Sequence, residues 1–523
     1  MRALLVYAAF PRTYWGFQHG LPIAGKRASL PPLGLVTLAA HLPAGFELRL
    51  VDMNIEPLTD EHLRWADVLL VGGMRIQTPS MHAVLGRARA RGAAGPVTVV
   101  GGPAATTSPE DFPDADVVFR GEVEGRADSL VRAIEARLAA RGSERPPEIL
   151  DAPGCLPEIS TGPLPRFDLL DLGAYASMCL QYSRGCPFRC EFCDIIEIFG
   201  RVARVKAPEQ VLAELGALHE LGYRGTLFFV DDNFIGNLRE VKKLLPRLRQ
   251  WQEERGRPLE LYTEASVNLA RDPELVRAMV QSGFTSVFVG IESPSPDVLR
   301  DAGKSQNARV DLVQAVETLT RGGLEVMGGF IVGFDGDGPE IFEAQLRFLA
   351  DAPIPLAMVG VLTALPGTAL WRRLEREGRL RADSNGDQFG RPNYKPAMNE
   401  ETLLRGYADL LSRLYSPDGY LRRCEAYLRL SPAAARTGVR PGGVAILARA
   451  IVRLGLFGSR RRHFWSLLGQ AVRRSPRTIS WAIGHAIQGE HLIRYTREDV
   501  LPRIQVAIEE LRAGAAEPAC TAG

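Results

Sequence analysis

The N-terminal part of the chain alternates short apolar runs with longer amphipathic stretches. The apolar runs are continuous, which is typical of strands in a parallel sheet that is covered on both faces. We therefore expect a Rossmann-like α/β sandwich over residues 1–141, with ligands at the carboxyl ends of its strands. The predicted strands are Arg2–Tyr7, Phe46–Asp52, Asp67–Gly72, Val97–Gly102 and Asp116–Arg120, and the predicted helices are Leu33–Leu42, Ser80–Arg91 and Ala127–Ala140.

Residues 142–175 begin with a stretch rich in Pro, Gly and Glu, which predicts a linker. The alternation then resumes in longer units, as in a parallel barrel whose chemistry lies at the carboxyl ends of the strands. We assign a (β/α)6 partial barrel to residues 176–385. Its predicted strands are Met178–Ser183, Thr226–Asp231, Leu259–Ala265, Ser286–Glu292, Glu325–Val332 and Leu356–Leu362, and its helices are Pro208–Leu221, Leu238–Arg255, Pro273–Ser282, Arg309–Arg321, Glu340–Leu349 and Thr368–Glu377.

No strand is predicted in the last part of the chain, and we expect an all-α domain over residues 386–523. This domain is locally basic, because between Glu425 and Glu490 there are eleven Arg and no Asp, Glu or Lys. Arginine beside aromatic residues on amphipathic helices indicates an anionic membrane surface. The alternatives are a solvated face, or a face packed on an acidic part of the same chain. The predicted helices are Thr402–Tyr415, Pro417–Leu428, Gly443–Leu456, Phe464–Arg473 and Arg497–Ala513.

Composition narrows the class of protein. The 523 residues are 46% hydrophobic and 24% charged, which is ordinary for a globular chain and argues against global disorder. A formal net charge of +2 does not indicate a nucleic-acid-coating protein. We expect no secretory signal, because Met1–Tyr7 has the pattern of a buried strand. No apolar run approaches the length that crosses a membrane, so we expect a cytoplasmic protein, with possible association at a membrane surface.

The cysteines carry the most specific signal. Their number is odd and three are crowded together, so they do not form a disulfide framework. The crowded run is Ser183-Arg-Gly-Cys186-Pro-Phe-Arg-Cys190-Glu-Phe-Cys193, with the spacing Cys-x3-Cys-x2-Cys. Three thiolates on one short loop can hold three irons of a [4Fe–4S] cluster and leave the fourth iron open. The other cysteines, which we expect to be incidental, are Cys155, Cys179, Cys424 and Cys520.

Two other interpretations of this run stay open. A structural zinc site needs four protein ligands, and the fourth would be Cys179 or His219, neither of which has the usual paired spacing. A non-catalytic iron–sulfur sensor would use the same cysteines, and a fourth cysteine ligand would favour it.

The run resembles the signature of the radical S-adenosylmethionine (SAM) superfamily, and the resemblance covers residues 178–380. It implies that Cys186, Cys190 and Cys193 hold a [4Fe–4S] cluster. Three further motifs resemble the family's SAM-binding segments: Asp231-Asp232-Asn233-Phe234, Gly290-Ile-Glu292-Ser and Gly329-Phe-Ile331-Val-Gly333. Leu365-Pro366-Gly367-Thr368, after the sixth strand, resembles a segment that is typical of the cobalamin-linked branch of this superfamily. The resemblance and the chemistry of SAM together make the following residues candidate SAM contacts: Asp231, Asp232, Glu264, Ser266, Glu292, Ile331 and Gly333, with Arg184 and Lys304 for its carboxylate and Tyr182 lining the site.

The first domain resembles the cobalamin-binding domain of that branch, the B12-binding-domain radical SAM family of class B methyltransferases. The Asp-x-His-x-x-Gly motif, whose histidine can ligate cobalt, is absent, and its counterpart Asp52-Met-Asn54 has no histidine. The resemblance therefore implies cobalt without a protein imidazole. The candidate cobalamin contacts are Leu33, Met74, Gln77, Gly101, Gly102, Pro103, Gly121 and Glu122, of which Met74 and Gln77 are candidates for the lower face.

The resemblance implies a cobalamin-dependent enzyme that methylates an unactivated carbon through a 5′-deoxyadenosyl radical and methylcobalamin. No side-chain acid or base is required, so none is assigned. The cofactors implied are the cluster, SAM and cobalamin, and the partners are a small-molecule or lipid-like substrate and an external electron donor such as a flavodoxin or ferredoxin. The helical extension resembles a subgroup that includes hopanoid C-2 methylases, without identifying the substrate. The alternative is a radical SAM cyclisation, oxidation or rearrangement without methyl transfer.

Overall fold

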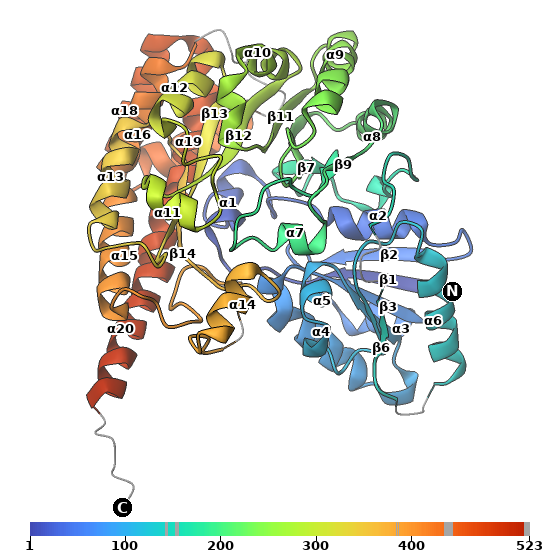
Figure 1. Cartoon of the computed structure of the whole chain (residues 1–523). Helices are drawn as coiled ribbons and strands as arrows, with labels where there is room; N and C mark the ends of the chain where they lie inside the picture. The colour runs from blue at the N-terminus through green and yellow to red at the C-terminus, as the bar shows by residue number, and fades with distance from the viewer. Residues whose placement is uncertain (142–144, 152–155, 383, 385, 433–442, 517–523) are drawn as a thin grey trace, which may run out of the picture. The chain divides into compact units, whose positions relative to one another are not determined.

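The computed structural model describes residues 1–141, 145–151, 156–382, 384, 386–432 and 443–516 (Figure 1). Cys155 and Cys520 lie outside the described residues. The chain divides into two compact units, which are described separately below. The first unit contains Met1–Gly16, Lys26–Pro187 and Asp194–Glu260, and the second contains Phe17–Gly25, Phe188–Cys193 and Leu261–Gly523.

The N-terminal sheet lies in the first unit and has six parallel strands in the order β2-β1-β3-β4-β5-β6. The strand order reverses at β1, which lies between β2 and β3, and Leu5 of β1 is in register with Leu50 and Leu70. Five strands were predicted and the sixth, β6, lies in the segment predicted as a linker. The strands are β1 (Arg2–Tyr7), β2 (Glu47–Asp52), β3 (Val68–Gly72), β4 (Val97–Gly101), β5 (Val117–Phe119) and β6 (Glu148–Leu150).

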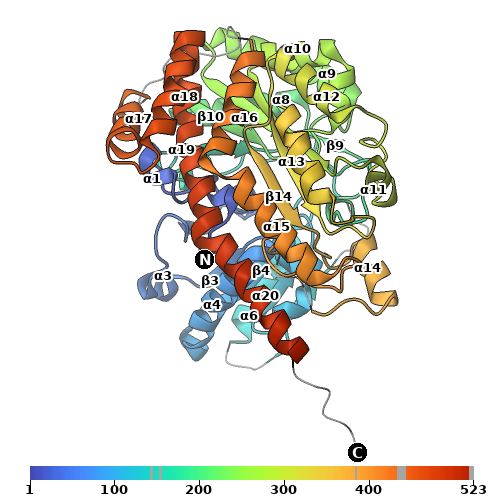
Figure 2. The same cartoon turned by 90° about the vertical axis from the view of Figure 1, so that its left-hand side faces the viewer.

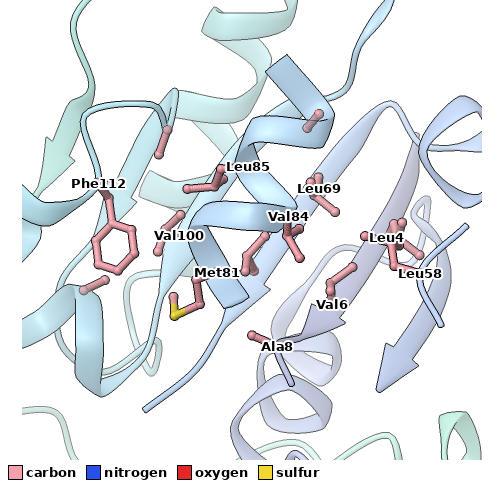
Figure 3. Close-up of a cluster of buried hydrophobic side chains, with 14 of the residues drawn as sticks. Leu4, Val6, Ala8, Leu58, Leu69, Met81, Val84, Leu85, Val100 and Phe112 are labelled. Carbon is pink, nitrogen blue, oxygen red and sulfur yellow. The ribbon is translucent and has the colours of Figure 1, made fainter. Parts of the chain in front are cut away.

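Helices cover both faces of this sheet, which explains why its strands are continuous apolar runs. On one face, alternate strand residues such as Val6, Leu69 and Val100 pack with Met81 and Phe112 (Figure 3). On the other face, the intervening strand residues pack against helices α2 and α6. The helices are α2 (Leu33–His41), α3 (Asp60–Trp65), α4 (Thr78–Arg89), α5 (Pro103–Thr107) and α6 (Ala127–Ala139).

The second sheet has the strand order β14-β13-β12-β11-β10-β7, and β7 pairs parallel with β10, as do β11 with β12, β12 with β13 and β13 with β14. The six predicted strands are confirmed, with small shifts at their ends. A two-residue ribbon of β8 (Ser183–Arg184) and β9 (Arg204–Val205) follows β7. The strands of the sheet are β7 (Ser177–Leu180), β10 (Gly225–Phe229), β11 (Leu259–Glu264), β12 (Phe284–Glu292), β13 (Glu325–Val332) and β14 (Ala357–Val361).

The helices between these strands follow the predicted alternation, and two short ones, α7 and α11, were not predicted. An Asn side chain at the N-cap starts α9, and an Asp side chain at the N-cap with Pro in the first turn starts α10. The helices are α7 (Ile195–Ile198), α8 (Pro208–Glu220), α9 (Leu238–Glu254), α10 (Pro273–Gln281), α11 (Pro296–Asp301), α12 (Leu312–Gly322), α13 (Ile341–Asp351) and α14 (Ala369–Arg376).

The helical C-terminal region belongs to the second unit, together with the short helix α1 from near the N-terminus (Figure 2). Arg449 of α17 donates to the carbonyl oxygens of Ile23 and Ala24 in α1. The helices are α1 (Leu21–Ala24), α15 (Glu400–Leu414), α16 (Pro417–Leu430), α17 (Gly443–Ala450), α18 (Arg461–Arg474), α19 (Ile479–Tyr495) and α20 (Leu501–Ala516), and the π-helical segment Ile451–Leu456 continues α17.

Helix α19 was not predicted from the sequence. It is buried on most of its circumference, so it lacks the polar face that gives a helical period. It is anchored to the second sheet by Glu325 at the start of β13. The Glu325 carboxylate accepts a hydrogen bond from Trp481 Nε1 and lies 2.8 Å from His485 Nε2.

Candidate active site

The first cysteine of the run lies in a tight turn of the first unit. Gly185 has φ +95°, and a Cβ there would lie within 3.0 Å of the carbonyl oxygens of Phe199, Gly200 and Val202. The amide of Cys186 donates to the Gly200 carbonyl at 3.3 Å. Only glycine fits this turn, so the residue before the first thiol is dictated by backbone packing.

The other two cysteines lie in a segment of the second unit that is held by its backbone and by one arginine. The Glu191 amide donates to the Ala302 carbonyl at 3.0 Å, and the Glu191 carbonyl accepts from the Leu370 amide at 2.8 Å. The Glu191 carboxylate pairs with Arg373 at 2.9 Å. The amide, the carbonyl and the carboxylate of Glu191 therefore all fix the loop between Cys190 and Cys193. Sequence reasoning missed Arg373, which is 182 residues away.

Lys304 lies beside Cys190 and forms an ion pair with Glu292. Both side chains are nearly buried, at 12% and 10% exposed. The Gln306 amide donates to the Cys190 sulfur at 3.9 Å. Burial raises the pKa of the Cys190 thiol, and Lys304 and Gln306 act against that rise. Burial lowers the pKa of Lys304, but Glu292 and Cys190 outweigh it and the net direction is upward.

Glu292 ends β12 at a register shift, with φ +66°, a strained conformation for a residue with a side chain. A Cβ on Gly290 would collide with the Glu292 carboxylate and the Lys304 ammonium, so this glycine makes room for the ion pair. The structure thus brings together Glu292, Lys304 and Cys190, which the sequence assigned separately to SAM and to the cluster.

Asp231 and Asp232 follow β10 in the first unit. The Asp231 carboxylate is 1% exposed and accepts the backbone amides of Tyr182 and Ser183. Burial raises its pKa to about 7, and these hydrogen bonds oppose the rise. Asp232 is half-buried and accepts the Gly185 amide at 2.9 Å, and burial raises its pKa to about 6. Both carboxylates hold the turn that precedes Cys186; their proposed contact with SAM is not tested by this geometry.

The remaining candidate SAM contacts lie at strand ends of the second unit. Glu264, Ser266 and Ile331 are half-buried. Gly333 has φ +100°, and its amide donates to the Asp337 carboxylate at 2.8 Å. Asp337 also accepts the Phe334 amide, and burial raises its pKa to about 7. Asp337 closes this turn and was missed by sequence reasoning.

Three loops meet at the carboxyl ends of β1, β3 and β4, where cobalamin contacts are predicted. The Ala104 amide donates to the Gly73 carbonyl at 3.3 Å, and Gln77 Nε2 donates to the Ala8 carbonyl. Gly102 has φ +90°, and a Cβ there would lie 3.2 Å from the Gly73 oxygen. This edge is lined by backbone, which suits the close approach of a large flat ring. Leu33, Gly101 and Pro103 are half-buried around it.

The two residues predicted for the lower face of cobalt differ in exposure. Met74 is 47% exposed at this edge. Gln77 is fully buried, and its amide oxygen accepts the Met74 amide at 2.7 Å. Met74 is therefore the better placed of the two. The first-unit histidines His62 and His82 have other partners: His62 caps α3, and the His82 ring stacks on Phe112.

Glu122, predicted to contact cobalamin, lies at the centre of a buried ion cluster. Its carboxylate is 4% exposed and pairs with Arg184 and with Arg204, the latter at 2.6 Å. Arg184 also pairs with Glu124 at 2.8 Å. The adjacent Gly121 has φ +85° and donates to the Thr106 hydroxyl. These pairs link the loop after β5 to the strand that precedes Cys186, two residues before the thiol.

Within the described part of the chain, no three His, Cys, Asp or Glu side chains are gathered closely enough to hold a metal ion. Cluster binding by Cys186, Cys190 and Cys193 therefore rests on the donor set: three half-buried thiols on a loop whose backbone is clamped in each unit. Cys179, the alternative fourth ligand, is buried in β7 at 2% exposed, and burial raises the pKa of its thiol. That environment suits packing better than metal binding.

A pocket in the helical region involves none of the predicted site residues. It lies among α16, α18, α19 and the π-helical segment. Apolar side chains such as Tyr420, Leu454 and Phe464 line it, with Arg460, His463 and Glu490.

Comparison with known families assigns three regions of the chain. Residues 25–131 match the B12 binding domain, and residues 180–349 match the Radical SAM superfamily. Residues 368–503 match a domain of unknown function, DUF4070.

Two curated relatives span almost the whole chain. An uncharacterized methyltransferase of Synechocystis is 41% identical over 95% of this chain and 92% of its own length. The hopanoid C-2 methylase of Rhodopseudomonas palustris is 35% identical over 95% of this chain and 94% of its own length.

Two solved structures share the fold. The cobalamin-dependent radical enzyme OxsB with aqua-cobalamin bound has a TM-score of 0.58 and 14% identity, over 98% of this chain and 84% of its own. The methyltransferase TsrM of Kitasatospora setae, with cobalamin and a [4Fe–4S] cluster, has a TM-score of 0.56 and 15% identity, over 95% and 99%.

Proposed function

Because the chain belongs to the radical SAM enzymes that carry a B12-binding domain, we propose that it methylates an unactivated carbon of a small-molecule, lipid-like substrate. Its cofactors are a [4Fe–4S] cluster, SAM and cobalamin. The observation that carries the proposal is the full-length similarity to two methyltransferases, which extends through the helical region. The lipid-like substrate class follows from the hopanoid methylase alone.

The residues of the chain serve to position these groups. When bound, the cluster and SAM supply one-electron chemistry for breaking a C–H bond, and cobalamin carries the methyl group. Cys186, Cys190 and Cys193 would hold the cluster, and the glycine-lined edge at β3 and β4, with Met74, would hold cobalamin. Phe192 packs on Phe334, with ring centroids 5.8 Å apart, and so shields the segment around Cys190 from water.

Two further parts of the proposal concern partners and place. An external donor such as a flavodoxin or ferredoxin would supply the electron, since the described residues contain no second run of clustered cysteines. We also propose a cytoplasmic enzyme that works at a membrane surface through its Arg-rich helices. No helix in the described part of the chain is long and apolar enough to cross a membrane.

The test is an anaerobic incubation of the reconstituted full chain with a low-potential reductant, methyl-deuterated SAM and a hopanoid as probe substrate. We expect 5′-deoxyadenosine and a product that carries the deuterated methyl group. Deoxyadenosine with an oxidised or rearranged, unlabelled product would overturn methyl transfer and favour another radical outcome. Reconstituted protein that retains no cobalamin would exclude the proposed methyl carrier.

A further inference from the structure

The turn between the π-helical segment and α18 exposes large apolar side chains. Phe457 is 83% exposed, Leu456 54% and Trp465 44%. Arg453, Arg461 and Arg462 are exposed on the same two segments. We call these six residues the tip surface.

The tip surface is held firmly from below. Leu454 and Phe464 are buried in a core cluster with Ile483 and Ile487 of α19. Trp465 Nε1 donates to the Gly455 carbonyl at 2.9 Å, which satisfies the polar edge of the ring while the rest of the indole stays exposed. The exposure of these apolar side chains is therefore fixed by the fold rather than by a loose loop.

The stretch of chain that carries the tip surface has charge of one sign, although Asp418 of α16 pairs with His463 at 2.8 Å. The described residues 443–489 contain no Asp, Glu or Lys. Two neighbouring arginines are used inside the fold, because Arg449 bonds α1 and Arg460 pairs with Glu490 at 2.5 Å. The three arginines of the tip surface are exposed instead, and they form no ion pair within the described part of the chain. The surface therefore combines apolar rings with fixed positive charge.

We propose that the tip surface docks the protein on an anionic lipid bilayer, which deepens the proposed membrane contact. Leu456, Phe457 and Trp465 would enter the boundary between headgroups and acyl chains, where an indole with one satisfied polar edge is favoured. The guanidinium groups would meet lipid phosphates. A purely solvated face would not explain three large apolar side chains at its apex.

Vesicle co-sedimentation of the full chain tests the proposal without any need for substrate. The probes are vesicles of phosphatidylcholine alone and of phosphatidylcholine with phosphatidylglycerol. We expect binding to the anionic vesicles that weakens with salt. Each arginine near an anionic surface contributes about fivefold to partitioning, so R461Q/R462Q should weaken binding by about 25-fold. L456S/F457S should weaken it at least as much and leave a weaker, salt-dependent attachment.

Matched variants control for charge and for hydrophobicity. R132Q/R277Q removes two exposed helical arginines elsewhere, and V506S removes an exposed apolar side chain of α20 that is 52% exposed. Both should bind anionic vesicles as the parent does. Equal loss in the controls, or no binding by the parent, would overturn the proposal. A parent dimer that L456S/F457S converts to a monomer, without vesicle binding, would identify the surface as an interface between copies.

The failure of this inference is distinguishable from failure of the proposed function. Vesicle binding is measured without turnover, and SAM cleavage to 5′-deoxyadenosine can be measured in buffer without lipid. A variant of the tip surface that keeps SAM cleavage but loses vesicle binding supports both proposals.

Discussion

Asp337 shows how one buried carboxylate can shape the stability of a strand end. It accepts the amides of Gly333 and Phe334, and burial raises its pKa to about 7 from an ordinary value of 3.8. A raised pKa means that the folded state favours the protonated form. Its contribution to stability is present below about pH 4 and is lost as the pH rises toward 7.

This linkage gives a prediction for Asp337→Asn. The melting temperature of the variant relative to the parent should rise between pH 5 and pH 8, because Asn stays neutral. The change between pH 5 and pH 8 is at most about 3 kcal/mol, since about two pK units of the shift lie inside this window. Thermal unfolding at several pH values measures it.

Asp335→Asn is the matched control. Hydrogen bonds and charge from Arg379 and Arg373 lower the pKa of Asp335, so its stabilising contribution is lost only in acid. This variant should therefore be less stable than the parent by the same amount at pH 5 and pH 8. A parallel pH profile for the two variants would contradict the assignment of Asp337.

The cysteines give a second prediction at this scale. Cys190→Ala should lower the iron and sulfide content after reconstitution and abolish SAM cleavage, because one of three thiolate ligands is removed. Cys179→Ala is the control, since Cys179 is buried in β7 and should keep full iron content. Iron and sulfide assays with EPR of the reduced protein measure both. A loss of iron in Cys179→Ala would revive a four-cysteine site.

At the scale of elements, the anchoring of α19 to β13 can be tested through Glu325. Glu325→Ala leaves the buried Trp481 and His485 side chains without their acceptor. Such a loss typically costs about 1–3 kcal/mol per group. We expect a lower melting temperature and faster amide exchange in α19.

Glu325→Gln is the comparison, because it keeps an acceptor for Trp481 and should be destabilised less. Equal stability of Glu325→Ala and the parent would show that the helix is held by apolar packing alone.

How well the elements were predicted depends on how each one is buried. The strands of both sheets are apolar runs with Gly or Asp at their ends, and β13 was predicted at its observed bounds, Glu325–Val332. Helix α19 has no polar face, and the three-residue β6 follows a polar stretch, so neither gives a periodic signal. A local sequence pattern predicts a helix only where one face of the helix is buried and the other is polar. It predicts a strand where the strand is a continuous apolar run.

The candidate site followed the same logic. Gly102 and Gly333 were predicted as contacts of cobalamin and SAM, and both have a positive φ that favours glycine. The partners of Glu122 were not predicted, since Arg184 and Arg204 lie 62 and 82 residues away. The sequence motif shows that a charged side chain is present, but the fold determines which side chain pairs with it.

At the scale of the whole molecule, the predicted cofactor residues are distributed over two units. The glycine-lined edge of the N-terminal sheet belongs wholly to the first unit, whereas Cys190 and Cys193 belong to the second. Cys186 lies in the first unit with this edge, but Gly102 and Cys190 lie in different units, so we expect a substitution at either one to leave the backbone around the other in place. This separation predicts that cobalamin and the cluster are loaded independently.

Gly102→Ala and Cys190→Ala test this independence. Alanine at position 102 would have to adopt φ +90°, and its Cβ would lie 3.2 Å from the Gly73 oxygen. We therefore expect this variant to retain little cobalamin but full iron. Cys190→Ala should show the reverse. Gly86→Ala in α4 is the control for the first variant, because a Cβ there meets nothing within 4 Å. Absorbance and iron analysis of the same reconstituted samples decide the matter. Loss of iron together with cobalamin in Gly102→Ala would contradict independent loading and show that one cooperative structure holds both cofactors. The effects of the cluster variants would then have to be reinterpreted as folding defects of the whole chain.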